Sequence, residues 1–344
     1  MEVIIGLLVI AFGAFCQSIS YVPINKIKDW SWETYWIVQG LFAWLVFPYA
    51  GALLAVPSGH SLWSLIGESN SFNVWMTILF GVLWGIGGLT FGLSMRYLGV
   101  ALGQSIALGT CAALGTIMGP VLLNIFFPEL DPLSALTCSV IIGVAVTLLG
   151  IAVIGIAGSM KASALNESQA NDAVKDFNFP KGIGIALLSG LMSGCFNVGL
   201  EFGSSINFGD LTPSIYRSLP ATLLVTFGGF ITNAIYCLVQ NGRNKTWGDY
   251  AKGSVWINNL LFCMLAGALW YSQFFGLSLG KGFLVDSPTL VTLSFCILMA
   301  LNVVFSNVWG IVLKEWKGCS AKTICTLIAG LIILIVSCFL PQII

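Results

Sequence analysis

Ten stretches of the chain contain no Asp, Glu, Lys or Arg, and each is at least 19 residues long. They are 3–25, 34–67, 69–95, 97–128, 132–160, 182–200, 218–242, 253–280, 287–313 and 323–344. An α-helix needs about 20 mainly apolar residues to cross the hydrocarbon core of a bilayer. The pattern therefore predicts an all-α polytopic membrane protein with ten transmembrane helices.

The composition supports a membrane protein. Hydrophobic residues make up 57% of the chain and charged residues only 8%, with a mean hydropathy of +0.94. A soluble domain carries about 25% charged residues, and a transmembrane β-barrel consists of strands of about ten residues with alternating polarity. The apolar runs here are continuous, and the longest polar stretch, 159–181, is too short to form a core. We interpret it as a linker.

The Lys and Arg residues are distributed unevenly between the connections. Twelve of them lie in the odd-numbered connections, and the even-numbered connections hold only Arg217 and Lys281. Lys and Arg favour the cytoplasmic side of short loops, so we expect the odd connections in the cytoplasm and both termini outside. The N-terminus carries Glu2 and has no basic segment, so we expect the first helix to be retained as a membrane span.

The linker divides the chain into two five-helix segments, 1–158 and 182–344. The pattern Gly-x-Leu-Trp at 81–84 recurs at 267–270, with an offset of 186 residues. Chance similarity between Gly- and Leu-rich helices is the alternative explanation. A repeat with an odd number of helices must be inverted, and inverted repeats are typical of transporters with a substrate site near the midplane.

Several longer motifs are more specific. They are Tyr-Val-Pro-Ile-Asn-Lys-Ile-Lys at 21–28, Trp-Ser-Trp-Glu-Thr at 30–34, Phe-Gly-Val-Leu-Trp-Gly-Ile-Gly at 80–87, Met-Arg-Tyr-Leu-Gly at 95–99, Leu-Trp-Tyr-x-Gln-Phe-Phe at 269–275 and Val-Leu-Lys-Glu-Trp at 312–316. In these segments the chain resembles the bacterial L-rhamnose–proton symporter family of the drug/metabolite transporter superfamily. The resemblance implies two inverted five-helix halves in the inner membrane and proton-coupled uptake of L-rhamnose or a related monosaccharide.

A sugar site needs hydrogen-bonding groups for hydroxyls and an aromatic face for the ring, placed among apolar walls. The candidates for substrate binding are Gln17, Tyr21, Trp84, Gln104, Asn197, Trp270, Tyr271, Gln273 and Asn302. Gln17 and Asn197 occupy matching places in the two halves, which favours a functional role. Each polar residue could instead bind a neighbouring helix, because intramembrane polar side chains also join helices.

Proton coupling needs a group that changes its charge within the membrane, where ionisable residues are functional candidates. The candidates are Glu201 and Glu33. Glu201 could alternatively pair with Arg217 at the outer mouth. Glu33 could bind Lys28 or Arg96, or serve as an acidic residue in the first turn of a helix. We assign Arg96 and Arg217 to gating or to anchoring.

Other classes of function lack their motifs. The chain contains no GxxxxGK[ST] phosphate loop, no HExxH and no GxSxG. Its single His and its ten Cys, none with CxxC spacing, predict no metal site and no cofactor. With a net charge of zero, nucleic-acid binding is not expected. A monomeric carrier, not an enzyme, is the prediction. The alternatives are a superfamily carrier of a different metabolite, possibly an exporter, coupling to Na⁺, or a sensory or scaffold protein.

Overall fold

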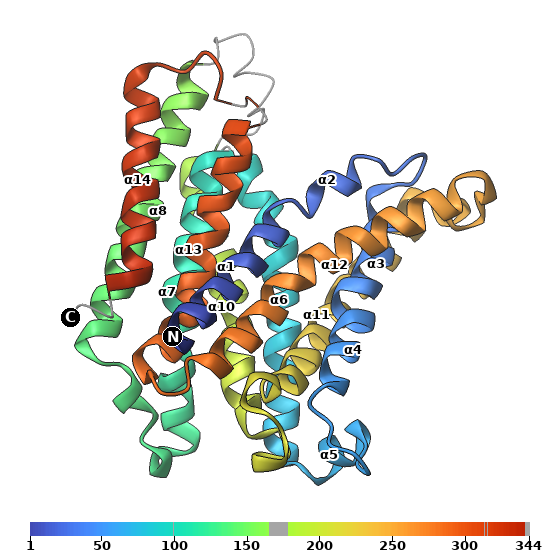
Figure 1. Cartoon of the computed structure of the whole chain (residues 1–344). Coiled ribbons are helices and arrows are strands. Elements are labelled where there is room, and N and C mark those ends of the chain that lie inside the picture. Colours follow the sequence, from blue (N-terminus) through green and yellow to red (C-terminus); the bar gives the residue numbers. More distant parts are fainter. Residues whose placement is uncertain (99, 165–177, 313, 315, 341–344) are drawn as a thin grey trace. The chain divides into compact units, whose positions relative to one another are not determined.

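The computed structural model describes residues 1–98, 100–164, 178–312, 314 and 316–340. Within these residues, ten helical stretches are long and apolar enough to cross a membrane, and no residue lies in a β-strand. Each of the ten overlaps one of the uncharged stretches, so the prediction of an all-helical protein with ten spans is confirmed (Figure 1).

The spans consist of the following helices. They are α1 (Glu2–Ser18) with α2 (Tyr21–Ile24), α3 (Trp32–Leu41) with η1 (Phe42–Val46) and α4 (Phe47–Leu53), α6 (Ser71–Leu98), α7 (Val100–Phe126), α8 (Cys138–Ala164), α10 (Phe179–Phe202), α11 (Leu219–Asn244), α12 (Gly253–Phe283), α13 (Pro288–Val312) and α14 (Ala321–Phe339). The connections contain α5 (Leu62–Glu68) and the 3₁₀ turns η2 (Pro128–Leu130), η3 (Pro132–Ala135), η4 (Gly203–Ser205), η5 (Gly209–Leu211), η6 (Ser214–Tyr216) and η7 (Trp247–Ala251).

The chain forms two compact units, and each combines segments from both halves of the sequence. Unit 1 contains Met1–Gly85 and Gly199–Asp286, and unit 2 contains Ile86–Val198 and Ser287–Ile344. The helices α6 and α10 each pass from one unit into the other. The proposed repeat boundaries at 158 and 182 stay predictions, and of the linker, residues 165–177 lie outside the described part of the chain.

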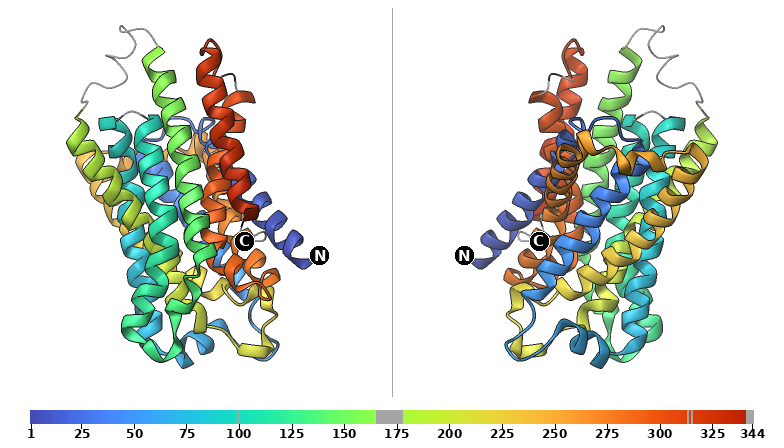
Figure 2. Two further views of the ribbon diagram at one scale, coloured as in Figure 1. Left: turned by 90° about the vertical axis from the view of Figure 1, so that its left-hand side faces the viewer. Right: turned by 90° about the vertical axis from the view of Figure 1, so that its right-hand side faces the viewer.

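In unit 1, α1 packs closely along α12 (Figures 1 and 2). Glycines make this approach possible. A Cβ atom on Gly13 would lie 2.5 Å from the carbonyl oxygen of Ser272, and one on Gly6 would lie 3.0 Å from the carbonyl oxygen of Gly280. Small residues let two helix backbones come together in a membrane, where dispersion contacts hold helices in place of the hydrophobic effect.

The uncharged stretch 34–67 does not form one helix. Its membrane helix ends at Leu53, and Pro57 and Gly59, with φ +85°, follow in the connection. A new helix, α5, starts after Ser61, whose side chain forms a reciprocal capping box with Ser64. The hydropathy pattern missed this break because the connection is itself uncharged.

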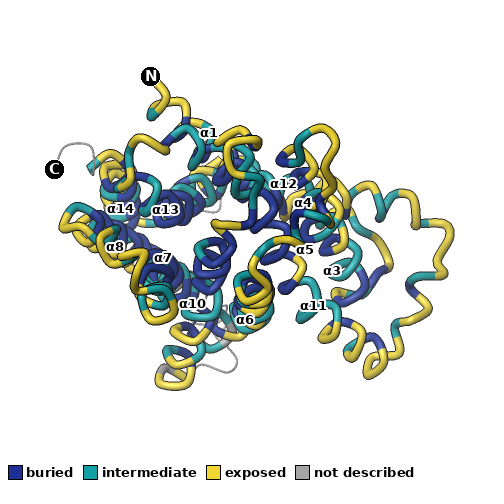
Figure 3. Tube along the Cα trace, turned by 90° about the horizontal axis from the view of Figure 1, so that it is seen from below, coloured by how far each residue is buried: buried dark blue, intermediate teal, exposed yellow. Residues whose placement is uncertain are grey.

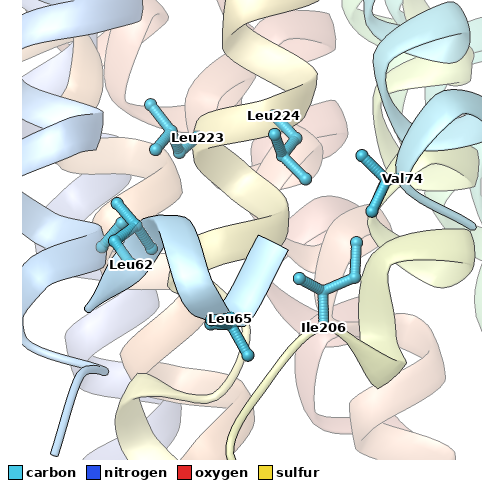
Figure 4. Close-up of a cluster of buried hydrophobic side chains, with 7 residues drawn as sticks. Leu62, Leu65, Val74, Ile206, Leu223 and Leu224 are labelled. Atoms are coloured by element: carbon cyan, nitrogen blue, oxygen red, sulfur yellow. The ribbon is translucent and has the colours of Figure 1, made fainter. Parts of the chain in front are cut away.

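The short helix α5 covers a small hydrophobic cluster in unit 1. Leu62 and Leu65 of α5 are buried beside Leu223 and Leu224 of α11, and Val74 and Ile206 complete the group (Figure 4). Burying a Leu side chain fully contributes roughly 1.5–3 kcal/mol. The cluster therefore holds α5 against the ends of α6 and α11.

In unit 2, α8 packs against both α7 and α14, and α13 packs against all three. Thr147 of α8 donates a hydrogen bond of 3.0 Å to Ser337 of α14. Figure 3 shows α13 mostly buried and the outer face of α8 exposed. This pattern suits a bundle in lipid, where the outer faces of helices remain apolar.

Candidate functional site

Three tryptophans from three spans meet in unit 1. The ring centroids of Trp84 (α6) and Trp270 (α12) lie 5.7 Å apart with an interplanar angle of 36°. The ring of Trp44 (η1) meets both edge-on, at 6.0 Å from Trp84 and 5.8 Å from Trp270. We call these three residues the tryptophan cluster. The structure thus brings together the two tryptophans that the sequence analysis named among the candidates for substrate binding.

Further rings extend the cluster on two sides. Phe274 lies one helical turn after Trp270, with centroids 5.2 Å apart, and also contacts Trp84. On the other side Trp36 contacts Trp44 at 5.7 Å and donates an indole hydrogen bond of 3.0 Å to the Oδ1 atom of Asn233. Trp36 therefore links the tryptophan cluster to Asn233 of α11.

Trp44 was missed in the sequence analysis, although it lies mid-way through an uncharged stretch, as Trp84 and Trp270 do. It sits on η1, a π-helical turn of five residues between α3 and α4. Such turns are rare overall, but a large share of those that occur lie at functional sites. The position of Trp44 within its uncharged stretch could have identified it as a candidate. The π-helical turn could not have been predicted, because it produces no signal in the hydropathy pattern.

Among the described residues, some buried polar atoms on the second and eighth spans have no hydrogen-bond partner. They are the Nε1 atom of Trp44, the Oε1 atom of Gln39 and the hydroxyl of Tyr271. All three residues are at most 6% exposed. A buried polar group with no partner costs about 1–3 kcal/mol, so native proteins keep few of them. Gln273 is also buried, and its Nε2 atom donates to the carbonyl oxygen of Trp270 at 3.2 Å. Aromatic rings and buried polar groups are the two kinds of side chain that a polyhydroxylated ring needs.

Two further candidates of unit 1 lie apart from these rings in the chain. Gln17 is partly buried in the last turn of α1, and Tyr21 begins α2 and is 53% exposed. Neither belongs to the tryptophan cluster.

Three predicted substrate residues lie in unit 2. Asn197 of α10 is buried, and its Nδ2 atom donates a hydrogen bond of 2.8 Å to the carbonyl oxygen of Gly115 in α7. Its Oδ1 atom is buried and has no hydrogen-bond partner among the described residues. Asn302 is buried in α13, and Gln104 is partly buried in α7. Asn197 thus joins two helices with one side of its amide and leaves the other side available to a ligand.

Glu201 forms an ion pair. Its Oε1 atom lies 3.4 Å from the Nζ atom of Lys281 in α12, and the side chain of Lys281 is only 15% exposed. Arg217 instead pairs with Asp210, at 3.1 Å. Our alternative of a pair between Glu201 and Arg217 is therefore wrong. Hydropathy could not identify Lys281 as the partner, because the two residues are 80 positions apart.

Glu33 opens α3, as expected for an acidic residue in a first helical turn. Its Oε1 atom accepts hydrogen bonds from Asn244 at 3.0 Å and from Thr246 at 2.8 Å. The carboxylate is thus held by two neutral donors, and the alternative of a pair with Lys28 is not seen among the described residues. The side chain of Arg96 lies outside the part that the structure describes.

The Trp-Ser-Trp-Glu-Thr motif is anchored a second time, through Asp249 in η7. Its Oδ2 atom accepts from the backbone N–H of Ser31 at 2.7 Å and from the Thr34 hydroxyl at 3.2 Å, and Lys252 donates to Oδ1 at 2.6 Å. Burial alone would raise the pKa of Asp249, but the hydrogen bonds from Lys252 and Ser31 outweigh it and lower the pKa to about 2. The motif therefore fastens the start of α3 to the connection between α11 and α12.

The described residues contain no group of three or more His, Cys, Asp or Glu side chains that could hold a metal ion.

Comparison with known proteins identifies close sequence relationships over nearly the whole chain. Residues 1–342 match the sequence model of the L-rhamnose-proton symport protein family. The L-rhamnose-proton symporter of Yersinia pestis (strain Pestoides F) is 31% identical over 343 residues, which covers 97% of this chain and 96% of that protein. The L-rhamnose-proton symporter of Yersinia pseudotuberculosis serotype O:1b (strain IP 31758) matches with the same identity and coverage. Because the family match and these alignments span nearly the whole sequence, the chain belongs to the L-rhamnose-proton symporter family.

Proposed function

We propose that this protein imports L-rhamnose or a related monosaccharide together with a proton across the bacterial inner membrane, by alternating access. Its family consists of proton-coupled transporters, so the chain is a transporter and not an enzyme. The relatives named L-rhamnose-proton symporter support both the sugar and the coupling ion.

The observation that carries the proposal is the tryptophan cluster with its neighbouring polar atoms. A sugar ring has an apolar face, which can stack on Trp84 or Trp270, and hydroxyls, which can pair with the Tyr271 hydroxyl and the Gln39 amide oxygen. Binding would provide the hydrogen bonds that these buried atoms lack, and it would remove a cost of about 1–3 kcal/mol for each. Gln17, Tyr21, Gln104, Asn197, Gln273 and Asn302 remain proposed substrate residues.

Glu201 is the proposed proton carrier. Protonation of its carboxylate from the outside neutralises one member of the ion pair with Lys281 and leaves a partly buried ammonium group uncompensated. Removing one partner of such a pair is costly, so proton binding favours a rearrangement around α10 and α12. Release of the proton inside restores the pair. Glu33 is the alternative carrier, but neutral donors hold it and it has no described cationic partner.

Two glycine contacts support an inverted duplication. Gly81 of α6 lies against the backbone of Val225 in α11, and a Cβ atom on Gly267 of α12 would lie 2.8 Å from the Cβ atom of Phe42 in η1. The third span thus approaches the seventh through Gly81, and the eighth span approaches the second through Gly267. Both glycines belong to the recurring Gly-x-Leu-Trp pattern. This correspondence is expected of halves 1–158 and 182–344 related by inversion. A duplicated chain has both halves of a carrier, so we propose a functional monomer with both termini outside.

The test is uptake of labelled L-rhamnose into proteoliposomes under an inward proton gradient, an inward Na⁺ gradient, or neither. Accumulation that needs the proton gradient and collapses with an uncoupler supports the proposal. Accumulation driven only by Na⁺ contradicts proton coupling. Exchange of other monosaccharides without L-rhamnose uptake, or net export under the same gradient, would favour a carrier of a different metabolite.

A further inference from the structure

A cavity of about 930 Å³ lies in unit 2 among α7, α8 and α14. Its volume falls within the range of about 300–1,000 Å³ that is typical of small-molecule sites. None of its lining residues is a candidate substrate residue. The lining is mainly apolar on α8, with hydroxyl groups contributed by α7, by the end of α8 and by the start of α14.

The cavity has the dimensions of one lipid leaflet. Along α8 it extends from Leu148 to Met160, twelve residues that rise about 18 Å at 1.5 Å per residue. Half of the roughly 30 Å hydrocarbon core is about 15 Å. Gly109, Ala152 and Gly155 are among the lining residues and have little or no side chain. Ile156 is 56% exposed, so the cavity is a groove open toward the surroundings of the bundle.

The groove becomes more polar along its length, although Thr110 of α7, next to Gly109, also lines it. Leu148 and Ile151 lie at the inner end, whereas Ser159, Ser320 and Thr323 lie at the end where α8 finishes and α14 begins. Among the described residues that line the groove, none is Asp or Glu.

Two lysines follow at the polar end. Lys161 comes directly after the lining residue Met160, and its Nζ atom lies 4.6 Å from the centroid of the Trp316 ring. Lys322 precedes Thr323 and is exposed. In the sequence, residues 314–322 carry three Lys and one Glu, so the segment that leads into α14 has a net positive charge.

We propose that this groove binds an anionic phospholipid, with one acyl chain along α8 and the phosphate group between Lys161 and Lys322. Basic pockets between transmembrane helices bind anionic head groups because two cations and several hydroxyls can neutralise and hydrogen-bond a phosphodiester. The acyl chain lies along the apolar lining of α8, which includes Leu148, Ile151 and Ile156. The lipid would join α7, α8 and α14, and it would stabilise this unit without entering the sugar site.

The first experiment compares phosphatidylglycerol with phosphatidylcholine of identical acyl chains. The purified full-length protein is titrated with each lipid and studied by native mass spectrometry and thermal unfolding. We expect retained phosphatidylglycerol, affinity at least tenfold higher than for phosphatidylcholine, and a higher Tm. Equal binding of the two lipids overturns the proposal. The second probe is glycerol phosphate, which has no acyl chains. If it stabilises the protein as much as phosphatidylglycerol does, the site binds only an anion, and the proposal of a lipid in the groove is wrong.

Matched variants locate the site. A Cβ atom on Gly109 meets Leu148 and Ile151 at 3.4 and 3.6 Å, which is ordinary contact, so Gly109→Ala should fold and bind as the wild type does. Gly109→Leu adds three further carbons inside the groove and should abolish the preference for phosphatidylglycerol, with an unchanged Tm in phosphatidylcholine. If Gly109→Leu still prefers phosphatidylglycerol, the lipid does not bind in this groove and the proposal fails. If the wild type is a dimer and Gly109→Leu is a monomer, the groove is occupied by a second copy of the chain and the proposal also fails.

The charge requirement has its own variants. The double change Lys161→Gln and Lys322→Gln should reduce the preference at least tenfold, whereas the corresponding double change to Arg should keep it. Lys26→Gln serves as the control, because Lys26 lies in unit 1 and is exposed. An equal loss with Lys26→Gln would mean that overall charge, and not this groove, selects the lipid.

Discussion

The indole rings of Trp84 and Trp270, 186 residues apart in the chain, lie with their centroids 5.7 Å apart and their planes inclined by 36°. The edge of Trp44 closes the group at about the same distance from both. Offset and edge-to-face contacts of this kind are worth about 0.5–1.5 kcal/mol each beyond the area that they bury. Rings held by one another can offer a preformed face to a substrate, because little side-chain freedom is left to lose on binding.

Replacing Trp270 by Ala should weaken sugar binding. The variant loses a stacking surface and three ring contacts, and a loss of about 1.4 kcal/mol corresponds to a roughly tenfold higher KM. Trp270→Phe should retain part of the affinity, because it keeps an aromatic face. The measurement is the concentration dependence of L-rhamnose uptake in proteoliposomes. Trp63→Ala is the control, since Trp63 is 69% exposed, and an equal effect there would contradict a specific role for the cluster.

Glu201→Gln should separate accumulation from exchange. A neutral amide cannot carry a proton, so the variant should equilibrate labelled sugar across the membrane but should not concentrate it under a proton gradient. Counterflow and gradient-driven uptake, measured on the same vesicles, distinguish the two activities. Normal accumulation by Glu201→Gln would transfer the coupling role to Glu33, and normal accumulation by Glu33→Gln as well would refute both assignments.

Lys281→Gln should lower stability more than the double change Glu201→Gln and Lys281→Gln does. The single change leaves a partly buried carboxylate without its ammonium partner, whereas the double change removes both charges. Breaking one side of a buried pair is costly, and replacing both sides can be nearly neutral. Thermal unfolding in detergent of the wild type, the two single variants Glu201→Gln and Lys281→Gln, and the double variant gives the coupling energy between the two residues. Additive effects would mean that the ion pair contributes nothing.

Gly13→Ala should destabilise the contact between α1 and α12. The added Cβ atom would meet the carbonyl oxygen of Ser272 at 2.5 Å, so the helices must separate, and overpacking of this kind costs about 1–3 kcal/mol. Gly88→Ala is the matched control, because a Cβ atom there has nothing within 4 Å. It should leave the Tm unchanged or raise it slightly, since Ala favours helix over Gly. A comparable loss at both positions would argue against close packing as the cause.

Asp249 should make stability depend on pH in the acid range. Its pKa is lowered from 3.8 to about 2 in the folded protein, so the folded state binds its proton less readily than the unfolded state does. The stabilisation is therefore fully present above about pH 4, and it is lost as the pH falls toward 2. Asp249→Asn should lose this component of the acid sensitivity and should be less stable at neutral pH.

The measurement is the Tm between pH 7 and pH 3 for the wild type, Asp249→Asn and the exposed control Asp286→Asn. We expect the difference between the wild type and Asp249→Asn to shrink at the acid end, while Asp286→Asn follows the wild type throughout. A constant difference would show that the carboxylate contributes through packing and not through its charge.

The number of spans, the helical class and the family could be predicted from the sequence. Hydrocarbon thickness and the cost of burying charge act on each segment separately, so uninterrupted apolar length is sufficient to identify a span. The motifs at 30–34 and 95–99 are specific enough to indicate the family. The candidate site could be predicted in part, since Trp84 and Trp270 were among the predicted substrate-binding residues and do meet in the structure.

Only the tertiary structure decided which side chains meet. The π-helical turn that carries Trp44, the pairing of Glu201 with Lys281 and the capture of Glu33 by Asn244 and Thr246 join segments far apart in the chain. Each depends on how a helix is rotated and on how closely it approaches its neighbour. In a chain that is apolar on almost every face, hydropathy contains little information about rotation. Glycines and small irregularities in the helices, such as Gly13 and η1, decide it instead.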